Sequence, residues 1–528
     1  MARFRKLKRI LRPLVARLYW SFAGVALLLL LAVGATQIDW VQRRSAKWVQ
    51  GWLSSRFGLH VSAERVSLNL PLGATLHEAV VYDLQGDTLI DARELSTTLR
   101  YVAGMGTRIS LGHTRWIDGS IHLLSDSTGG LRLLQVLALF KRKTPPPKKK
   151  HIHLTISSID LQNVRFQMRR PGFTDPVGRV DYKHFDLRRI HGHVRYLSVA
   201  TDTVRMQIEG LQFVDRSGFT LKELSSRFSL SPHSLHFDDL HVASDDSDLH
   251  LPTLRFSYNG WRDLPHFVDS VHIQADVSPS KLHTHTLAYF VPLPRASGLP
   301  TMLSGRVQGR VSDFQVDNLN LFAADSTSIH LNASLVGLPD MHASVLNVEI
   351  DRMQTCLRDV EHIVSRMTQG SLHLPQPLRQ VSRLEYRGNL VGFMDDFVAY
   401  GTINSGLGQV QMDLGLSIDS ARTLRFNGQV HTHELHLDEL LRDTTWGRLS
   451  MVAHVDGELA RGGRFRSQLE SQVHSIDILG HRYHEIDLKG FATNRSYSGS
   501  LKVNDSALQL GFNGVVDFTG SLPVFRFN

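Results

Sequence analysis

The sequence contains a single cysteine among its 528 residues, so the chain cannot form an internal disulfide. Cys356 falls in the apolar register of an expected helix, which favours a small buried hydrophobic side chain over a reactive thiol. The chain also lacks a Gly-x-Ser-x-Gly nucleophile elbow, a phosphate-binding loop and a dinucleotide-binding fingerprint. These absences argue against an enzyme and against a bound cofactor.

A net excess of positive charge is absent outside two short segments, although the net charge of the whole chain is +9. Residues 1–17 carry seven basic residues and no acid, and residues 141–150 (KRKTPPPKKK) carry six more. The rest of the chain is slightly acidic, which removes the main support for a nucleic-acid partner. Three prolines among lysines cannot pack into a core, so we interpret 141–150 as a solvated loop; contact with anionic lipid headgroups is the alternative.

Long apolar runs are absent, with one exception at Leu18–Ile38 (LYWSFAGVALLLLLAVGATQI). As a helix this run would be about 31 Å long, which matches the hydrocarbon thickness of a bilayer. The basic residues before it favour a cytoplasmic N-terminus and export of the chain that follows. We expect a single-pass anchor; a cleaved signal peptide is the alternative, because residues 32–35 are small. The anchor positions that we single out are Leu18, Trp20, Phe22, Leu30 and Ile38.

Helical periodicity is rare in the remaining sequence. Residues 39–58 repeat apolar side chains at three- and four-residue spacing, which predicts an amphipathic helix that enters the body or lies on the membrane surface. A helix is also expected at 131–140, between a first β section (59–140) and the lysine- and proline-rich loop. Within the second β section (151–528), the apolar stripe of residues 353–369 predicts one more helix, ending at Gly370.

Strict alternation of apolar and polar residues dominates the chain, as in QVQMDLGLSID at residues 409–419. This period is typical of a β-strand with one dry face and one wet face. Turns rich in Asn, Asp, Ser and Gly favour antiparallel pairing of successive strands. The fold class expected is therefore mainly β. The residues expected to line its apolar face are Val410, Met412, Leu414, Leu416, Ile418, Leu424, Phe426, Leu508, Leu510 and Phe512.

A second pattern interrupts the alternation four times. In each case the apolar register slips by one residue at an Asn, Asp or Gly, namely at Asn163, Gly210, Asp239 and Asn318. These residue types tolerate left-handed backbone, which a β-bulge or tight bend requires. The pattern predicts bulges at these positions and sheets that curl.

Histidine, a common metal ligand, is plentiful, with 28 copies. Four His-x-His pairs occur, at His151/His153, His191/His193, His283/His285 and His431/His433. On a strand each pair shares a face, but no cysteine or carboxylate cluster accompanies them at ligand spacing. His433-Glu434-Leu435-His436 is one residue short of the zinc-protease spacing. We therefore expect solvated polar faces and no metal site.

The order of these parts resembles the AsmA-like proteins, and specifically the TamB type of Bacteroidetes-like envelopes. The resemblance rests on the N-terminal apolar run and on four later segments. They are VSLNLPLGATLHEAVVYDLQGDTLIDARELSTTLRY (66–101), TRISLGHTRWIDGSIHLLSDSTGGLRLLQVL (107–137), SGRVQGRVSDFQVDNLNL (304–321) and IDILGHRYHEIDLKGFATNRSYSGSLKVNDSALQLGFNGVVDF (476–518). The similarity consists of residue patterns and short stretches of sequence, without an invariant motif.

The resemblance implies a bacterial inner-membrane protein with a periplasmic body, built as a long twisted sheet curled into an open groove. Such a groove would carry phospholipids towards the outer membrane, and an Omp85-type barrel would be a partner. Family members run longer, so we expect this chain to be an N-terminal portion. Two alternatives stay open: a β-rich scaffold or chaperone for outer-membrane proteins, and a closed β-sandwich array acting as a surface or adhesive protein.

Overall fold

The computed structural model describes residue 51 and residues 60–69, 73–82, 86–103, 108–124, 153–169, 178–181, 184–200, 202–290, 300–324, 326–340, 342–368, 383–419, 423–460, 463–517, 519 and 524–527. The expected anchor Leu18–Ile38, the helix 131–140 and the loop 141–150 lie outside these residues, and of the helix 39–58 only Gly51 is described, as helical. None of the helices within the described residues has the length and apolarity needed to cross a bilayer.

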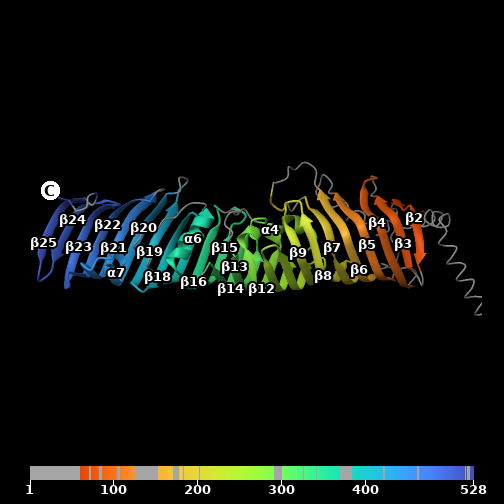
Figure 1. The fold of residues 1–528 in the computed structure, drawn as a ribbon, viewed down its shortest axis with the longest axis horizontal. Helices are drawn as coiled ribbons and strands as arrows, with labels where there is room; N and C mark the ends of the chain where they lie inside the picture. Colours follow the sequence, from red (N-terminus) through yellow and green to blue (C-terminus); the bar gives the residue numbers. More distant parts are fainter. Residues whose placement is uncertain are drawn as a thin grey trace, which may run out of the picture. The chain divides into compact units, whose positions relative to one another are not determined.

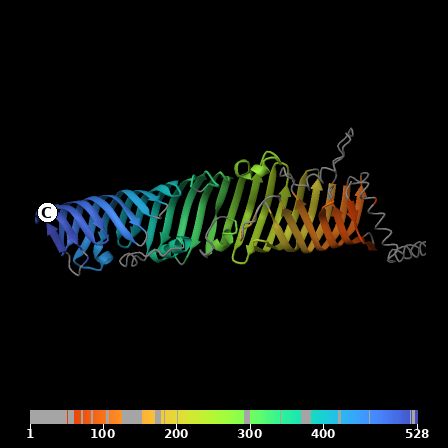
Figure 2. The ribbon, with the colours of Figure 1, turned by 90° about the horizontal axis from the view of Figure 1, so that it is seen from above.

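The described chain is mainly β, as the alternation predicts, and forms two compact units, Met1–Ser231 with Val242–Asp245, and Pro232–His241 with Asp246–Asn528. Figures 1 and 2 show the strands of each unit side by side. The strands of the first unit are β1 (His60–Ser62), β2 (Arg65–Asn69), β3 (Gly73–Tyr82), β4 (Thr88–Ala103), β5 (Arg108–Leu124), β6 (His153–Arg169), β7 (Asp186–Ala200), β8 (Thr203–Asp215) and β9 (Thr220–Leu230).

In the first unit nearly all neighbouring strands are antiparallel. β1 and β2 both pair with β3, and β3 to β9 then pair in chain order. The exception is β5 with β6, which run parallel, with Arg108 opposite His153 and Leu124 opposite Arg169. The expectation of antiparallel pairing is wrong at this point, because β6 begins at the same end of the sheet as β5.

The second unit is a long antiparallel meander in which each strand from β11 to β26 pairs with the next. Its strands are β10 (Ser234–Ser244), β11 (Asp248–Ser257), β12 (His272–His283), β13 (Pro300–Arg310), β14 (Asp313–Ala323), β15 (Thr327–Val336), β16 (Val345–Thr355), β17 (Leu384–Phe393), β18 (Asp396–Ser405), β19 (Gly408–Ile418), β20 (Leu424–His436), β21 (Trp446–Ala460), β22 (Arg464–Ile478), β23 (His481–Thr493), β24 (Ser496–Asn504), β25 (Gln509–Asp517) and β26 (Val524–Phe527). The sheet is open, and the curl into a groove that the sequence suggested is not a feature of these strands.

Helices in the described chain are few and short: η1 (Leu264–His266), α4 (Phe267–Ser270), α5 (Thr284–Leu287), α6 (Leu357–Thr368) and α7 (Leu437–Leu441). The helix expected at 353–369 begins four residues later than predicted. Met353 instead extends β16, where it pairs with Ile329 on one side and Tyr386 on the other, so tertiary pairing overrides the helical stripe. Cys356, at the junction, is half-buried rather than buried, and its Sγ accepts a hydrogen bond from the Asp359 N–H.

The start of α6 is fixed by a polar contact. The Asp359 carboxylate accepts hydrogen bonds from Ser326 N (2.8 Å), Ser326 Oγ (2.8 Å) and Thr327 Oγ1 (3.1 Å). Burial by itself would raise the pKa of Asp359, but these hydrogen bonds stabilise the charged form and hold the pKa below its usual value. An ionised Asp359 thereby attaches the helix to the end of β15.

Candidate functional site

The expected lining residues of β19 share one face of the sheet. Residues directly opposite one another in an antiparallel ladder project to the same side. Leu414 lies opposite Ala399 on β18 and Gly428 on β20, and Leu416 lies opposite Phe397 and Phe426. The ladder therefore brings Val410, Met412, Leu414, Leu416, Ile418, Leu424 and Phe426 together on one side, which we call the apolar face.

Rows of apolar residues cross the apolar face from β16 to β25. The row through Leu414 contains no charged residue and consists of Val348, Leu390, Ala399, Leu414, Gly428, Val455, Leu469, Gly490, Gly499 and Gly514. The row through Met412 includes Ile350, Val430, Leu488, Leu501 and the expected lining residue Phe512. At about 4.8 Å between strands, ten strands give a row of roughly 43 Å.

The exposure of the apolar face lies between that of a core and that of a surface. Val410, Met412, Leu414, Leu416, Leu424, Phe426 and Phe512 are half-buried. Three other expected lining residues are exposed: Ile418 by 45%, Leu510 by 44% and Leu508 by 38%. A side chain in a closed core would lose nearly all of its exposure. Among the described residues, these positions therefore have neighbours within the sheet, but no complete second layer packs over them.

The opposite face of the same strands is polar. The row through Asp413 contains Gln429, His454, Glu470 and Lys489, and the Lys489 ammonium lies 3.0 Å from the Glu470 carboxylate. A one-residue step along β19 therefore changes the environment of a side chain from an apolar row to a charged one. The sheet is amphipathic across its two sides.

Aromatic rings lie over glycines on the apolar face. A Cβ atom added to Gly388 would lie 2.7 Å from Tyr386 Oη, and one added to Gly401 would lie 2.8 Å from Tyr386 Cε2. Phe426 covers Gly457 in the same way, with 2.7 Å to its Cζ, and stacks on Phe465 at 6.0 Å between ring centroids. Burial raises the pKa of the Tyr386 hydroxyl. Rings lying flat on glycine backbone give this part of the face an apolar surface without a covering element.

One region of the apolar face does have a cover. Leu449, Val473, Ile486 and Val503 form a buried cluster, and Leu437 of α7 packs against it. α7 lies against β21 (Figure 1). We call these four residues the covered cluster. It shows what the apolar face becomes when an element packs on it.

The structure places all four candidate bulge residues in left-handed backbone, with φ of 55° at Asn163, 59° at Gly210, 51° at Asp239 and 51° at Asn318. The ladder register shifts across Asn163, between Leu161 and Val164, and across Asn318, between Val316 and Leu319. Opposite Gly210 the shift lies on β7, between His191 and His193. Left-handed backbone and register shifts therefore occur where the apolar alternation slips.

At Asn318 and Gly210 a neighbouring side chain accepts the backbone N–H of the bulge residue. Asn318 N donates to Asn332 Oδ1 (2.8 Å), and Gly210 N donates to Ser225 Oγ (3.0 Å). The same arrangement recurs at a bulge without a sequence signal, where Glu434 N donates to Ser450 Oγ (3.0 Å). Since an unpaired buried N–H is costly, these acceptors make the bulges stable parts of the fold.

Among the described residues, no His-x-His pair belongs to a group of three or more potential metal ligands. His193 Nδ1 lies 2.7 Å from the Asp160 carboxylate, whereas His191 Nδ1 accepts a hydrogen bond from Asn163 N. His283 accepts from His285 N, and both rings of the His431/His433 pair are exposed. His151 lies outside the described residues and His153 is exposed at the start of β6.

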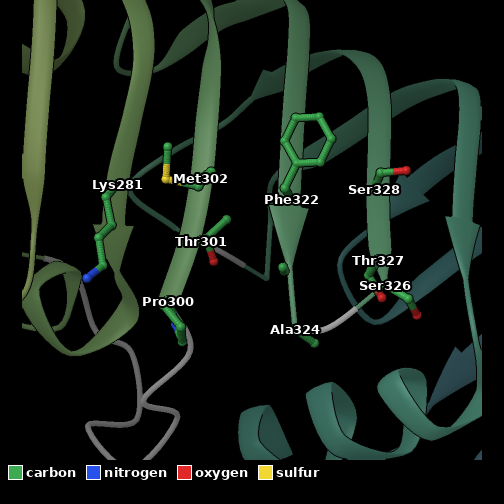
Figure 3. Close-up of a pocket in the computed structure, with 10 residues that line it drawn as sticks. Lys281, Pro300, Thr301, Met302, Phe322, Ala324, Ser326, Thr327 and Ser328 are labelled. Carbon is green, nitrogen blue, oxygen red and sulfur yellow. The ribbon is translucent and has the colours of Figure 1, made fainter.

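A hollow of about 410 Å³ lies on β12 to β15 and is lined by Lys281, Met302, Phe322 and Ser328 among others (Figure 3). Met302 pairs with Phe322 and Phe322 with Ser328, so these side chains share one face. Ile329 pairs with Met353, and Met353 pairs with Tyr386 on the apolar face. Ser328 is adjacent to Ile329 on β15, so its side chain projects to the opposite face. The hollow therefore lies on the polar side, and sequence alternation did not predict the exposed Met302 and Phe322 there.

Comparison with family models, with curated proteins and with solved structures gave no match for this chain.

Proposed function

We propose that the protein transfers phospholipids along the apolar face, from an inner-membrane anchor at Leu18–Ile38 towards the outer membrane. The observation that carries the proposal is the uncharged row through Leu414, in which Leu390, Leu414, Val455 and Leu469 are half-buried and have no complete cover among the described residues, while Val348 and Ala399 are buried. Acyl chains are the natural occupants of such a row, because they are apolar, extended and need no polar partner.

Binding energy for a lipid is available without a specific site. Burial of apolar surface is worth about 25 cal/mol per Å², or roughly 0.8 kcal/mol for each methylene group. A two-chain lipid resting on several rows would gain enough to leave water, while the lack of a polar anchor would let it slide.

The alternatives make different demands on this face. A β-sandwich needs a second sheet over the apolar face, and half-buried Leu414 and exposed Ile418 speak against one within the described residues. A scaffold for outer-membrane proteins, working with an Omp85-type barrel, would use strand edges rather than the face. Lipid transfer would use the uncharged row through Leu414, which runs from β16 to β25 in the second unit.

A photo-crosslinking residue at position 414 in living cells tests the proposal, with position 413 as its control. The two positions are adjacent on β19 but project to opposite faces. We expect phospholipid adducts at 414 and few at 413. Equal labelling at both positions, or adducts at 414 only to another polypeptide, would refute lipid transfer along this face.

A further inference from the structure

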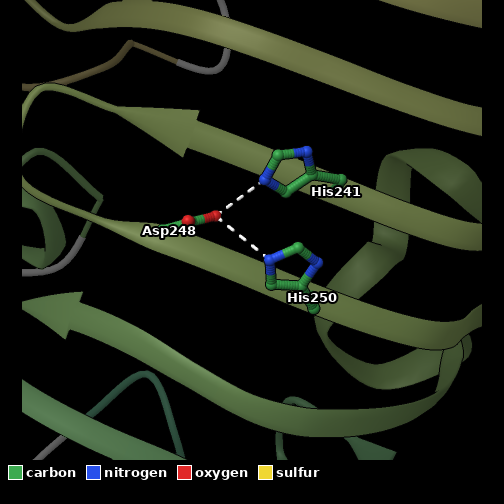
Figure 4. Close-up of side chains that lie close together, drawn as sticks. All are labelled: His241, Asp248 and His250. Atoms are coloured by element: carbon green, nitrogen blue, oxygen red, sulfur yellow. Dashed lines mark hydrogen bonds and ion pairs between the residues drawn. The ribbon is translucent and has the colours of Figure 1, made fainter.

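Two histidines and one aspartate converge on the hairpin of β10 and β11. His241 lies on β10, and Asp248 and His250 lie two residues apart on β11, so they share a face (Figure 4). The Nε2 of His241 lies 2.7 Å from Asp248 Oδ1, and the Nε2 of His250 lies 3.3 Å from the same oxygen. All three ligand atoms lie within 4.8 Å of one another.

The two imidazole rings are stacked, with centroids 4.3 Å apart and planes inclined by 8°. The stacking brings one ring nitrogen of each histidine to the same carboxylate oxygen. Two imidazole nitrogens and one carboxylate oxygen around a common point can each offer a lone pair to a divalent cation.

The distances suit a small transition-metal ion. Tetrahedral zinc with ligand bonds of about 2.0–2.1 Å places its ligand atoms about 3.3 Å apart. The separation from His250 Nε2 to Asp248 Oδ1 is already 3.3 Å, and that from His241 is shorter. The Asp248 side chain is 55% exposed, so it has room to rotate and widen the shorter separation.

The backbone that presents these ligands is held in place. His250 N donates to Ser280 Oγ (2.8 Å), and Ser280 is 1% exposed. Asp248 lies opposite Lys281, which pairs with Met302, so the cluster lies on the same face as the hollow of Figure 3. Three ligands leave a coordination position open towards solvent.

We propose that His241, Asp248 and His250 form a binding site for a divalent transition-metal ion of the zinc type, which joins β10 to β11. Imidazole nitrogen with a carboxylate oxygen is a ligand set that such ions accept, whereas Mg²⁺ and Ca²⁺ prefer oxygen alone. The inference does not rest on lipid transfer, because the cluster lies on the polar side of the sheet and the Leu414 rows on the other.

The test uses the full-length chain, stripped of metal with a chelator and titrated with Zn²⁺ in the presence of a competing chelator. We expect one tight equivalent in the wild type and at least a tenfold loss of affinity in His241→Gln and in Asp248→Asn. His433→Gln, an exposed histidine on β20, is the control for adventitious binding by the other histidines and should leave the affinity unchanged.

Co²⁺ provides a second readout, since its visible absorption reports four-coordinate geometry and should be lost in the two ligand variants. Circular dichroism checks that each variant folds, and if one fails to fold the other decides. The proposal is overturned when the wild type binds no tight equivalent, or when a folded ligand variant binds Zn²⁺ as tightly as His433→Gln.

Discussion

Val410 and Val473 occupy the same row of the same sheet face, yet they experience different surroundings. The row passes from Val410 on β19 through Thr432 and Met451 to Val473 on β22. Val473 is 5% exposed within the covered cluster, whereas Val410 is half-buried. The difference comes from α7, because Leu437 of this helix packs against the cluster that contains Val473. Apolar alternation thus determines which face a side chain joins, and a separate element determines whether that face is closed.

The matched pair Val473→Asp and Val410→Asp should show the largest effect. At Val473 the carboxylate would be buried without a partner, and we expect a loss of about 4 kcal/mol or more in the free energy of unfolding. At Val410 the carboxylate can reach water, and we expect a loss of about 1–2 kcal/mol. Urea titration of both variants measures the difference. Equal losses would mean that the face near Val410 is as closed as the covered cluster.

The surface that the Tyr386 ring forms over Gly388 and Gly401, near Val410, can be disrupted by a larger side chain at the glycine. In Gly388→Val the new Cβ would lie 2.2 Å from Tyr400 O and 2.6 Å from Gly401 Cα, which are backbone atoms that cannot move aside cheaply. We expect a loss of about 2–3 kcal/mol from overpacking. Gly511→Ala is the control, since a Cβ there meets nothing within 4 Å. If the thermal melt of Gly388→Val matched that of the control, the close packing of Tyr386 and its neighbours on Gly388 would have no structural role.

The bulge at Glu434 marks the border between the two regions, because the register shifts between Thr432 and Leu435 just before α7. Ser450→Ala removes the acceptor of the Glu434 N–H, and we expect a loss of about 1 kcal/mol. Ser498→Ala, at an exposed position on β24, serves as the control. Hydrogen exchange at the Glu434 amide should accelerate in Ser450→Ala alone; unchanged exchange would contradict the role given to Ser450.

The face that the side chains of β19 and β20 join was predictable from sequence because the side-chain period of a strand is two residues, and the ladder adds only neighbours in register. The four left-handed positions could be found because an Asn, Asp or Gly marked the slip in alternation. The left-handed residues Glu78, Arg189, Glu434 and Glu485 carry no such mark, since their conformation is imposed by pairing with adjacent strands.

Other features depend on contacts that no local pattern encodes. The parallel pairing of β5 with β6 is set by the end of the sheet at which each strand begins. The His241, Asp248 and His250 cluster escaped the search for His-x-His pairs, because its ligands come from two strands that a hairpin brings together. α7 contains only five residues, which are too few for helical periodicity to reveal in the sequence a helix that packs over the sheet.

The most direct test of the central claim is mass spectrometry of lipids extracted from the purified full-length protein, its Leu414→Asp variant and its Asp413→Asn variant. Leu414→Asp places a charge in the uncharged row, while Asp413→Asn changes the polar face one residue away. We predict phospholipid with the wild type and Asp413→Asn, and at least a several-fold loss in folded Leu414→Asp. Equal amounts of phospholipid in all three proteins, or none in the wild type, would contradict lipid transfer along the apolar face.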